Sequence, residues 1–261
     1  MSPVGALPSD WLRPRGLPDA VSGVMTTRRG GTSAPPWASM NLGDAVGDEP
    51  AAVQRNRQRL AAHIGATPVF LRQVHGTRVV TVGAADVAPG IEPPVADASV
   101  TVEPGVACTV LVADCLPLLF AAPDGRAVAA AHAGWRGLAA GVVEATLEAL
   151  CAAAHCTPDQ VSVWLGASIG PRRFEVGADV LRAFGAEPSA VDGLRFTPRG
   201  AESPGKWLAD LPQLARDRLR QSGVRAVEGD GACTVEDGSR FFSYRRDGVC
   251  GRMAAAVWIC R

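Results

Sequence analysis

The fold of this chain is decided by residues 107–131, which read ACTVLVADCLPLLFAAPDGRAVAAA. Two runs within this stretch, Ala107–Ala113 and Ala127–Ala131, are apolar without alternation, which is typical of strands covered on both faces. Such strands need a helix layer or a second sheet on each side. The stretch therefore predicts the centre of a layered protein that contains both strands and helices.

Further strands are expected on both sides of this centre. One begins at Val21 and leads into a long loop rich in Gly and Pro. The other strand candidates are Val69–Val82, Ala98–Val102, Val161–Ile169, Val224–Glu228 and Met253–Ile259.

Helices are expected over Pro50–Ile64, where apolar residues recur on one side, and over Leu138–Ala153, which is rich in Ala, Leu and Glu. Two further helices are expected over Asp179–Phe184 and Trp207–Ser222, with Gly223 ending the second. Strands and helices do not alternate strictly. The predicted fold class is therefore α+β, with helices covering two packed mixed sheets.

Composition limits the classes of protein to be considered. The 261 residues suit a single sheet-rich domain, so we expect a loosely packed lead-in over residues 1–20 and one domain over residues 21–261. Lys+Arg and Asp+Glu are both 26, and this balance lacks the basic excess of proteins that bind nucleic acid. No apolar stretch approaches the roughly 20 residues of a membrane helix, and no signal peptide is expected.

The cysteines indicate the redox compartment. There are seven of them at scattered spacings, which fits reduced thiols better than a disulfide framework. We therefore expect a cytoplasmic protein with neither a nucleic-acid nor a membrane partner. The oligomeric state is left open by the sequence.

Three candidate metal ligands stand at the ends of apolar strands. His75 lies in LRQVHG, Cys115 in VLVADCLPL and His132 in AAAHAGWRG. Strand ends that open into Gly- or Pro-containing turns combine rigidity with access. Two His and one Cys would leave a tetrahedral zinc ion one open position, as in catalytic sites. The alternative is two ordinary histidines and a buried thiol, and the spacing of the three residues does not exclude it.

Arginine pairs beside glycines suggest recognition of phosphate or carboxylate groups. Surface arginines in turns are the alternative for each pair. Arg136 is more suggestive, because it follows Trp135 in the same turn as His132. The pairs are Arg28–Arg29, Arg172–Arg173 and Arg245–Arg246.

Seven motifs taken together resemble the bacterial laccase-domain family, also called multicopper polyphenol oxidase-like or peptidoglycan editing factor proteins. The resemblance covers nearly the whole chain. The motifs run from Thr26 to Ile259 in the order TTRRGGTS, ASMNLG, LRQVHG, ADCLPLLF, AAHAGWRGL, LGASIGPRRFEVG and CTVEDGSRFFSYRRDGVCGRMAAAVWI.

The resemblance implies an α/β/β/α layered fold, related to the catalytic domain of a bacterial deamidating toxin, and zinc bound by His75, Cys115 and His132. It also implies phosphorolysis of adenosine, inosine, guanosine and methylthioadenosine, with adenosine deamination at the same site. The expected small-molecule partners are thus nucleosides and phosphate, and the expected cofactor is Zn²⁺.

On this hypothesis, further residues receive roles in the reaction. Arg136 and Arg28 are the candidates for phosphate, and Asn41 is the candidate for a ribose or base contact. Trp135 is a candidate for stacking on the base, with a core Trp as the alternative. Glu175 is a candidate acid or base, with a Glu at a helix N-terminus as the alternative.

Asp114, beside Cys115, is a candidate for orienting a metal ligand.

Three other functions are weighed against nucleoside phosphorolysis. A copper-dependent polyphenol oxidase would need many more imidazoles than the two that remain, His63 and His155, so copper is less favoured than zinc. A Cys–His amidase that edits cell-wall precursors would use Cys115 as nucleophile and His132 as base, but leaves His75 without a role. A structural zinc protein would usually bring a fourth ligand and a CxxC motif, which the sequence lacks.

Overall fold

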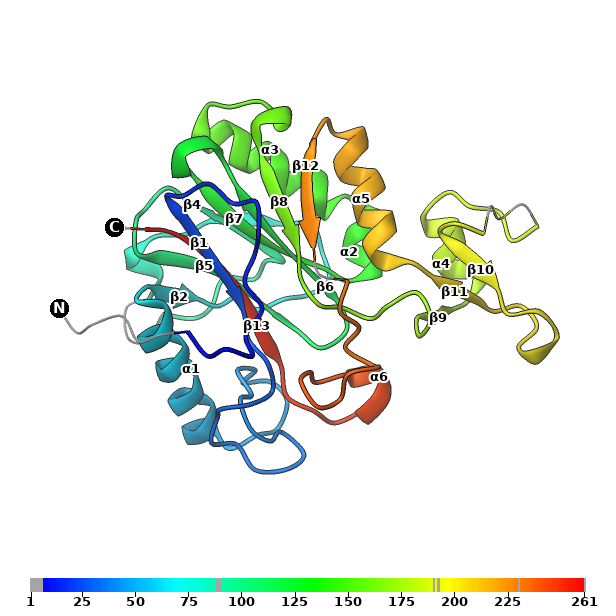
Figure 1. Ribbon diagram of the computed structural model, residues 1–261, viewed down its shortest axis with the longest axis horizontal. Coiled ribbons are helices and arrows are strands. Elements are labelled where there is room, and N and C mark those ends of the chain that lie inside the picture. The colour runs from blue at the N-terminus through cyan, green and yellow to red at the C-terminus, as the bar shows by residue number, and fades with distance from the viewer. Residues whose placement is uncertain (1–6, 88–90, 190, 192, 230, 261) are drawn as a thin grey trace.

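Two mixed β-sheets form the centre of the computed structural model, which describes residues 7–87, 91–189, 191, 193–229 and 231–260 (Figure 1). The four-stranded sheet has the order β1 (Val21–Met25), β13 (Met253–Ile259), β5 (Val106–Val112) and β2 (Thr67–Val69). The six-stranded sheet has the order β12 (Ala226–Gly229), β8 (Ser162–Leu165), β6 (Leu116–Ala121), β7 (Val128–Ala133), β4 (Ala98–Thr101) and β3 (Val79–Thr81).

The apolar stretch of residues 107–131 lies where the two sheets face one another, as predicted. It supplies β5 to the four-stranded sheet and the antiparallel pair β6–β7 to the six-stranded sheet. Cys108 and Val110 of β5 belong to the same buried cluster as Val128 and Ala130 of β7. This cluster between the sheets explains why neither run alternates with polar residues.

Helices cover the outer faces of both sheets. Leu60 and Ile64 of α1 (Pro50–Ile64) pack against the four-stranded sheet. On the other side, α3 (Val142–Ala154) and α5 (Leu211–Gln221) pack against the six-stranded sheet. Figure 1 shows α1 on one side of the molecule and α3 with α5 on the other. The α+β class with layered mixed sheets is therefore confirmed.

A smaller antiparallel sheet stands to one side of these layers in Figure 1. It has the order β10 (Phe196–Pro198), β11 (Trp207–Ala209) and β9 (Glu175–Val176), with α4 (Ala178–Ala183) beside it. The remaining short helices are α2 (Trp135–Ala140), α6 (Tyr244–Asp247) and the 3₁₀ turns Ala84–Val87, Pro123–Gly125, Pro158–Gln160 and Gly200–Glu202.

Several predicted elements have different bounds in the structure. The helix Pro50–Ile64 and the strand Met253–Ile259 are found as predicted. The strand Val69–Val82 is wrong over most of its length, because β2 ends at Val69 and β3 starts only at Val79. The loop between these strands carries His75.

The helix predicted over Leu138–Ala153 is two helices. α2 ends at Ala140, and α3 begins at Val142. Gly141 between them has a φ of 104°, in the left-handed region that glycine reaches without strain. The helix predicted from Trp207 is also wrong at its start. β11 ends at Ala209, and Asp210 caps α5, because its Oδ1 accepts a hydrogen bond of 2.9 Å from the N–H of Gln213.

Strand β6 was not predicted. Pro117 stands near its start, and a proline argues against a central strand because it cannot donate to the ladder. Residues 1–6 of the predicted lead-in lie outside the described residues. The rest of the lead-in is more firmly packed than expected, since Trp11 is buried and Leu12 pairs with Met25. No helix in the described part of the chain is long and apolar enough to cross a membrane.

Candidate metal site and its pocket

Three ligand atoms converge at one edge of the two sheets. His75 comes from the loop between β2 and β3, Cys115 from the turn between β5 and β6, and His132 from β7. Their ligand atoms all lie within 4.8 Å of one another. The Cys115 Sγ is 3.7 Å from His75 Nε2, and the two imidazole rings meet edge to face with centroids 4.8 Å apart. The structure thus brings together the three residues that the sequence singled out.

Asp97 holds the loop that carries His75. Its carboxylate accepts hydrogen bonds from the backbone N–H groups of Val74 (3.1 Å), His75 (2.8 Å) and Gly76 (2.7 Å). These bonds stabilise a tight turn in which His75 has a φ of 61°, an uncommon conformation for a residue other than glycine. The loop therefore owes its shape to one side chain from the start of the neighbouring strand.

The same carboxylate orients the second histidine. Asp97 Oδ1 is 2.9 Å from Nδ1 of His132, and both side chains are buried. Because Nδ1 is engaged, Nε2 is the ring nitrogen that remains for a metal ion. Sequence reasoning missed Asp97. The available signal was a lone carboxylate in the otherwise apolar text VADASV.

Two glycines of the HAGWRG motif make room for the cluster. A Cβ on Gly134 would lie 2.7 Å from Cδ2 of His75 and 3.1 Å from Sγ of Cys115. A Cβ on Gly137 would lie 2.9 Å from the carbonyl oxygen of Gly76. Side chains at these positions would push the segment after β7 away from the His75 loop.

The electrostatics of the cluster favour a thiolate. Burial alone would raise the pKa of Cys115, but the charge and hydrogen bonds of His132 and His75 outweigh it and lower the pKa to about 6. Burial would lower the pKa of His132, but the Cys115 sulfur and the Asp97 carboxylate raise it to about 9. The thiolate is the form of cysteine that binds a metal ion.

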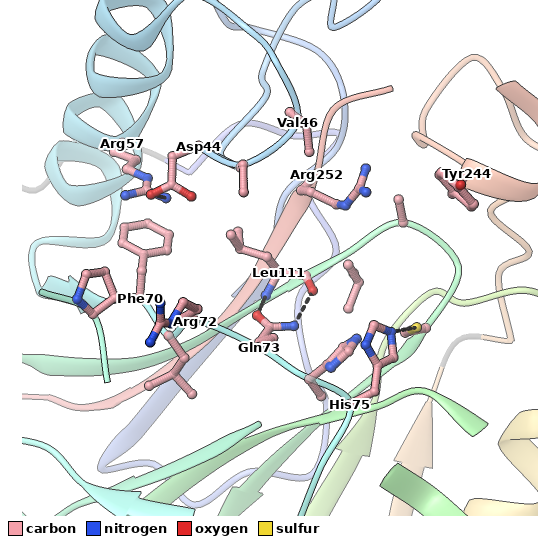
Figure 2. Close-up of a pocket in the computed structure, with 18 of the residues that line it drawn as sticks. Asp44, Val46, Arg57, Phe70, Arg72, Gln73, His75, Leu111, Tyr244 and Arg252 are labelled. Carbon is pink, nitrogen blue, oxygen red and sulfur yellow. Dashed lines mark hydrogen bonds and ion pairs between the residues drawn. The ribbon is translucent and has the colours of Figure 1, made fainter. Parts of the chain in front are cut away.

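The cluster opens into a cavity of about 710 Å³. Figure 2 shows Arg57, Asp44 and Phe70 in one part of this cavity, Arg252 and Tyr244 in another, and Gln73 with Leu111 between them. The amide of Gln73 pairs with both backbone groups of Leu111 at 2.8 and 2.7 Å, so it fastens the His75 loop to β5.

The arginines of the pocket differ in how far they are already engaged. Arg57 forms an ion pair of 3.1 Å with Asp44 and lies 4.1 Å from the centroid of Phe70. Arg252 donates one guanidinium nitrogen to the carbonyl oxygens of Cys250 and Gly251. Within the described residues, no hydrogen bond or ion pair of the Arg72 side chain is found.

The other sequence-predicted site residues do not line this pocket. Asn41 is buried, and its side chain bonds to Gly43, to Asp48 and to the backbone N–H of Arg252, so it braces the pocket wall. Arg28 donates to the carbonyl oxygens of Ala38 and Gly238 and thereby ties two loops together.

Arg136 and Trp135 stack on one another in α2, with the guanidinium 4.3 Å from the ring centroid. Glu175 lies in β9 instead of at a helix N-terminus, and its carboxylate is 3.4 Å from Nε of Arg199.

Asp114 does not contact a metal ligand with its side chain. It accepts hydrogen bonds of 2.6 Å from the Thr234 hydroxyl and from the backbone N–H of Arg245. The carboxylate that bonds to one of the three candidate ligands, His132, is that of Asp97.

Comparison with known proteins gives consistent results. The model of a family described as multi-copper polyphenol oxidoreductase laccase matches residues 22–260. The chain is 48% identical over 250 residues to a purine nucleoside phosphorylase of Pseudomonas aeruginosa, covering 95% of this chain and 98% of the relative. It is 45% identical over 251 residues to the purine nucleoside phosphorylase YfiH of Escherichia coli, covering 95% and 96%.

Solved structures share the whole architecture. A Neisseria meningitidis protein superposes with a TM-score of 0.87 at 44% identity, covering 97% of this chain and all of the other. YlmD from Geobacillus stearothermophilus superposes with a TM-score of 0.88 at 32% identity, covering 99% of each chain.

Proposed function

The chain belongs to the multi-copper polyphenol oxidoreductase laccase family, and from this premise we propose that it is a zinc-dependent purine nucleoside phosphorylase. The proposed substrates are adenosine, inosine, guanosine and methylthioadenosine, with adenosine deamination at the same site. The observation that carries the proposal is the His75–Cys115–His132 cluster in the wall of a cavity lined by guanidinium and aromatic groups. The names of relatives at 48% and 45% identity support it.

The donor set fits zinc. Two imidazoles and one thiolate are typical zinc ligands, and the Asp97–His132 bond is the outer contact that such histidines usually make. His75, Cys115 and His132 would hold the ion. When bound there, zinc would supply a Lewis acid.

The copper chemistry in the family's description does not fit this chain. A trinuclear copper cluster needs several more imidazoles, and the sequence has only two others. His63 packs edge to face on Trp11 with centroids 5.4 Å apart, and His155 caps the end of α3. Both therefore have structural positions of their own.

In phosphorolysis a phosphate oxygen bonds to C1′ of the ribose, while the bond from C1′ to the base nitrogen breaks and its electron pair leaves with the base. The phosphate must therefore be held close to the nucleoside. We assign this role to Arg252 and Arg72, which line the pocket, in place of Arg28 and Arg136, which do not. Tyr244, exposed at the pocket wall, offers a ring for stacking on the base.

A chromatographic assay of metal-analysed protein with adenosine, with and without phosphate, tests the proposal. Phosphate-dependent adenine and ribose 1-phosphate are expected from the wild type, and Cys115→Ala should lose both zinc and turnover. Cys260→Ala is the matched control, because that thiol is exposed and its hydrogen-bond partner is the Ser22 hydroxyl, away from the cluster. Inosine formed without phosphate would establish deamination alone. No turnover by zinc-loaded protein would refute the proposal.

One observation favours a second candidate, an amidase that edits cell-wall precursors. Asp97 hydrogen-bonds to His132, and His132 hydrogen-bonds to Cys115. These three side chains have the arrangement of an orienting carboxylate, a base and a nucleophile. A zinc-bound thiolate is a poor nucleophile, so this activity should rise when zinc is removed. Amide hydrolysis by metal-stripped protein, lost in Cys115→Ser and suppressed by added zinc, would favour the amidase.

A further inference from the structure

A pair of cysteines closes the C-terminal end of α3. The helix ends at Ala154, and His155 follows in the left-handed region with a φ of 52°. The backbone N–H groups of His155 and Cys156 both bond to the carbonyl oxygen of Cys151, the second at 3.1 Å. In this type of helix ending, the side chains at the positions of Cys151 and Cys156 come into contact.

The two thiols also lie close together in space, since the Cys156 sulfur is within hydrogen-bonding reach of Cys151. Both side chains are partly buried and pack against the cluster between α3 and the six-stranded sheet. Burial first, and then the charge and hydrogen bond of the Cys156 sulfur, raise the pKa of Cys151 to about 11. Cys151 therefore keeps its proton at neutral pH.

We propose that Cys151 and Cys156 form a thiol modification site, in which a peroxide oxidises the pair to a disulfide across the end of α3. The Cys156 sulfur first bonds to one peroxide oxygen as the O–O bond breaks, which releases water and leaves a sulfenic acid. The Cys151 sulfur then displaces the hydroxyl group as a second water. Two thiols are oxidised, and one peroxide is reduced.

This site is separate from the proposed zinc site. Cys115 belongs to the metal cluster, while Cys108 and Cys250 are buried, and burial raises the pKa of Cys108 to about 12. α3 packs on β7 without lining the pocket. The disulfide should therefore leave turnover of the zinc-loaded enzyme unchanged. It should also raise the melting temperature, because it constrains the unfolded chain.

Peptide mapping tests the proposal directly. Trypsin cleaves after Arg136 and Arg172, and the peptide of residues 137–172 contains no other Lys or Arg and only these two cysteines. After hydrogen peroxide treatment of the folded protein, this peptide should be about 2 Da lighter and resist alkylation until reduced. Cys260→Ser should behave like wild type, whereas Cys151→Ser should leave a sulfenic acid on Cys156 that dimedone traps.

Two outcomes would overturn the proposal. One is a peptide that still alkylates at both cysteines after oxidation. The other is a disulfide that forms no faster in the folded protein than in guanidinium, because the helix ending would then contribute nothing. The readouts are mass and melting temperature, so failure of the nucleoside assay does not affect this test.

Discussion

Asp97 Oδ1 lies 2.9 Å from Nδ1 of His132 and also accepts the backbone N–H of His75 at 2.8 Å. One buried carboxylate thus fixes the ring of one proposed zinc ligand and the backbone of another. The two histidines are far apart in the sequence, so this bridge joins the loop before β3 to the end of β7.

Asp97→Asn tests this bridge. The amide would present a donor to backbone N–H groups that also donate, so the His75 loop should loosen. We expect zinc affinity to fall about 10–100-fold, as for other outer contacts of zinc-binding histidines. Competition with a chromophoric chelator measures this affinity. Asp124→Asn, at an exposed position, is the control, and unchanged affinity in Asp97→Asn would contradict the assigned role.

Gly134→Ala should disrupt the cluster through contact alone. Its Cβ would meet His75 and Cys115 at distances that must force one of them to move. We expect loss of bound zinc by metal analysis. Gly177→Ala is the control, because the close neighbour there is the flexible Asp179 carboxylate. A Gly134→Ala protein with full zinc content would show that the cluster tolerates a wider spacing.

The thiolate predicts a pH dependence of alkylation. In zinc-free protein, the rate of Cys115 alkylation by iodoacetamide should rise with a midpoint near pH 6 instead of near its ordinary pKa of 9.0. Mapping the alkylated peptide measures this rate. His132→Gln removes the main charge that lowers the pKa, so the midpoint should move up. The same midpoint in both proteins would contradict the pairing.

The shifted pKa values of Cys115 and His132 also predict how the stability of the zinc-free protein depends on pH. The lowered pKa of Cys115 adds stability as pH rises from about 6 to 9.0. The raised pKa of His132 removes stability as pH rises from 6.5 to about 9. The two slopes cancel between 6.5 and 9, so this pair should leave the urea-unfolding free energy of the zinc-free protein flat there. A pronounced slope in wild type that is absent in the double variant Cys115→Ser/His132→Gln would contradict this.

The pocket arginines predict how phosphate is recognised. Arg252→Gln and Arg72→Gln should each raise the KM for phosphate, by about tenfold or more for a lost charged hydrogen bond. Arg136→Gln is the matched control, since that guanidinium stacks on Trp135 outside the pocket. Steady-state kinetics with varied phosphate give these values. A raised KM in Arg136→Gln alone would favour the assignment made from sequence.

Local signals in the sequence predicted the layers and singled out the three candidate ligands, and the family resemblance then assigned zinc to them. Apolar runs without alternation mark β5 and β7, and each ligand stands at the end of such a run or beside a glycine. The predicted ends of strands and helices were wrong where tertiary contacts decide where an element ends. The sequence of the His75 loop is typical of a strand. It forms a loop because its backbone N–H groups bond to the Asp97 carboxylate, and no local pattern shows this contact.

The pocket wall could not be predicted for the same reason. Arg57 comes from α1, Arg72 from the His75 loop and Arg252 from the residue before β13, and no local pattern links them. Arg28 and Arg136 stood in more suggestive motifs, yet their guanidinium groups hold loops or stack on Trp135. Motif proximity to a ligand did not imply a position in the pocket.

Catalysis by a zinc ion at the His75–Cys115–His132 cluster can be measured as the yield of ribose 1-phosphate from adenosine and phosphate, on zinc-free protein before and after zinc is restored. We expect no product from zinc-free protein, recovery in proportion to bound zinc, and no recovery in Cys115→Ala. Equal product from zinc-free and zinc-loaded protein would contradict a catalytic metal at His75, Cys115 and His132.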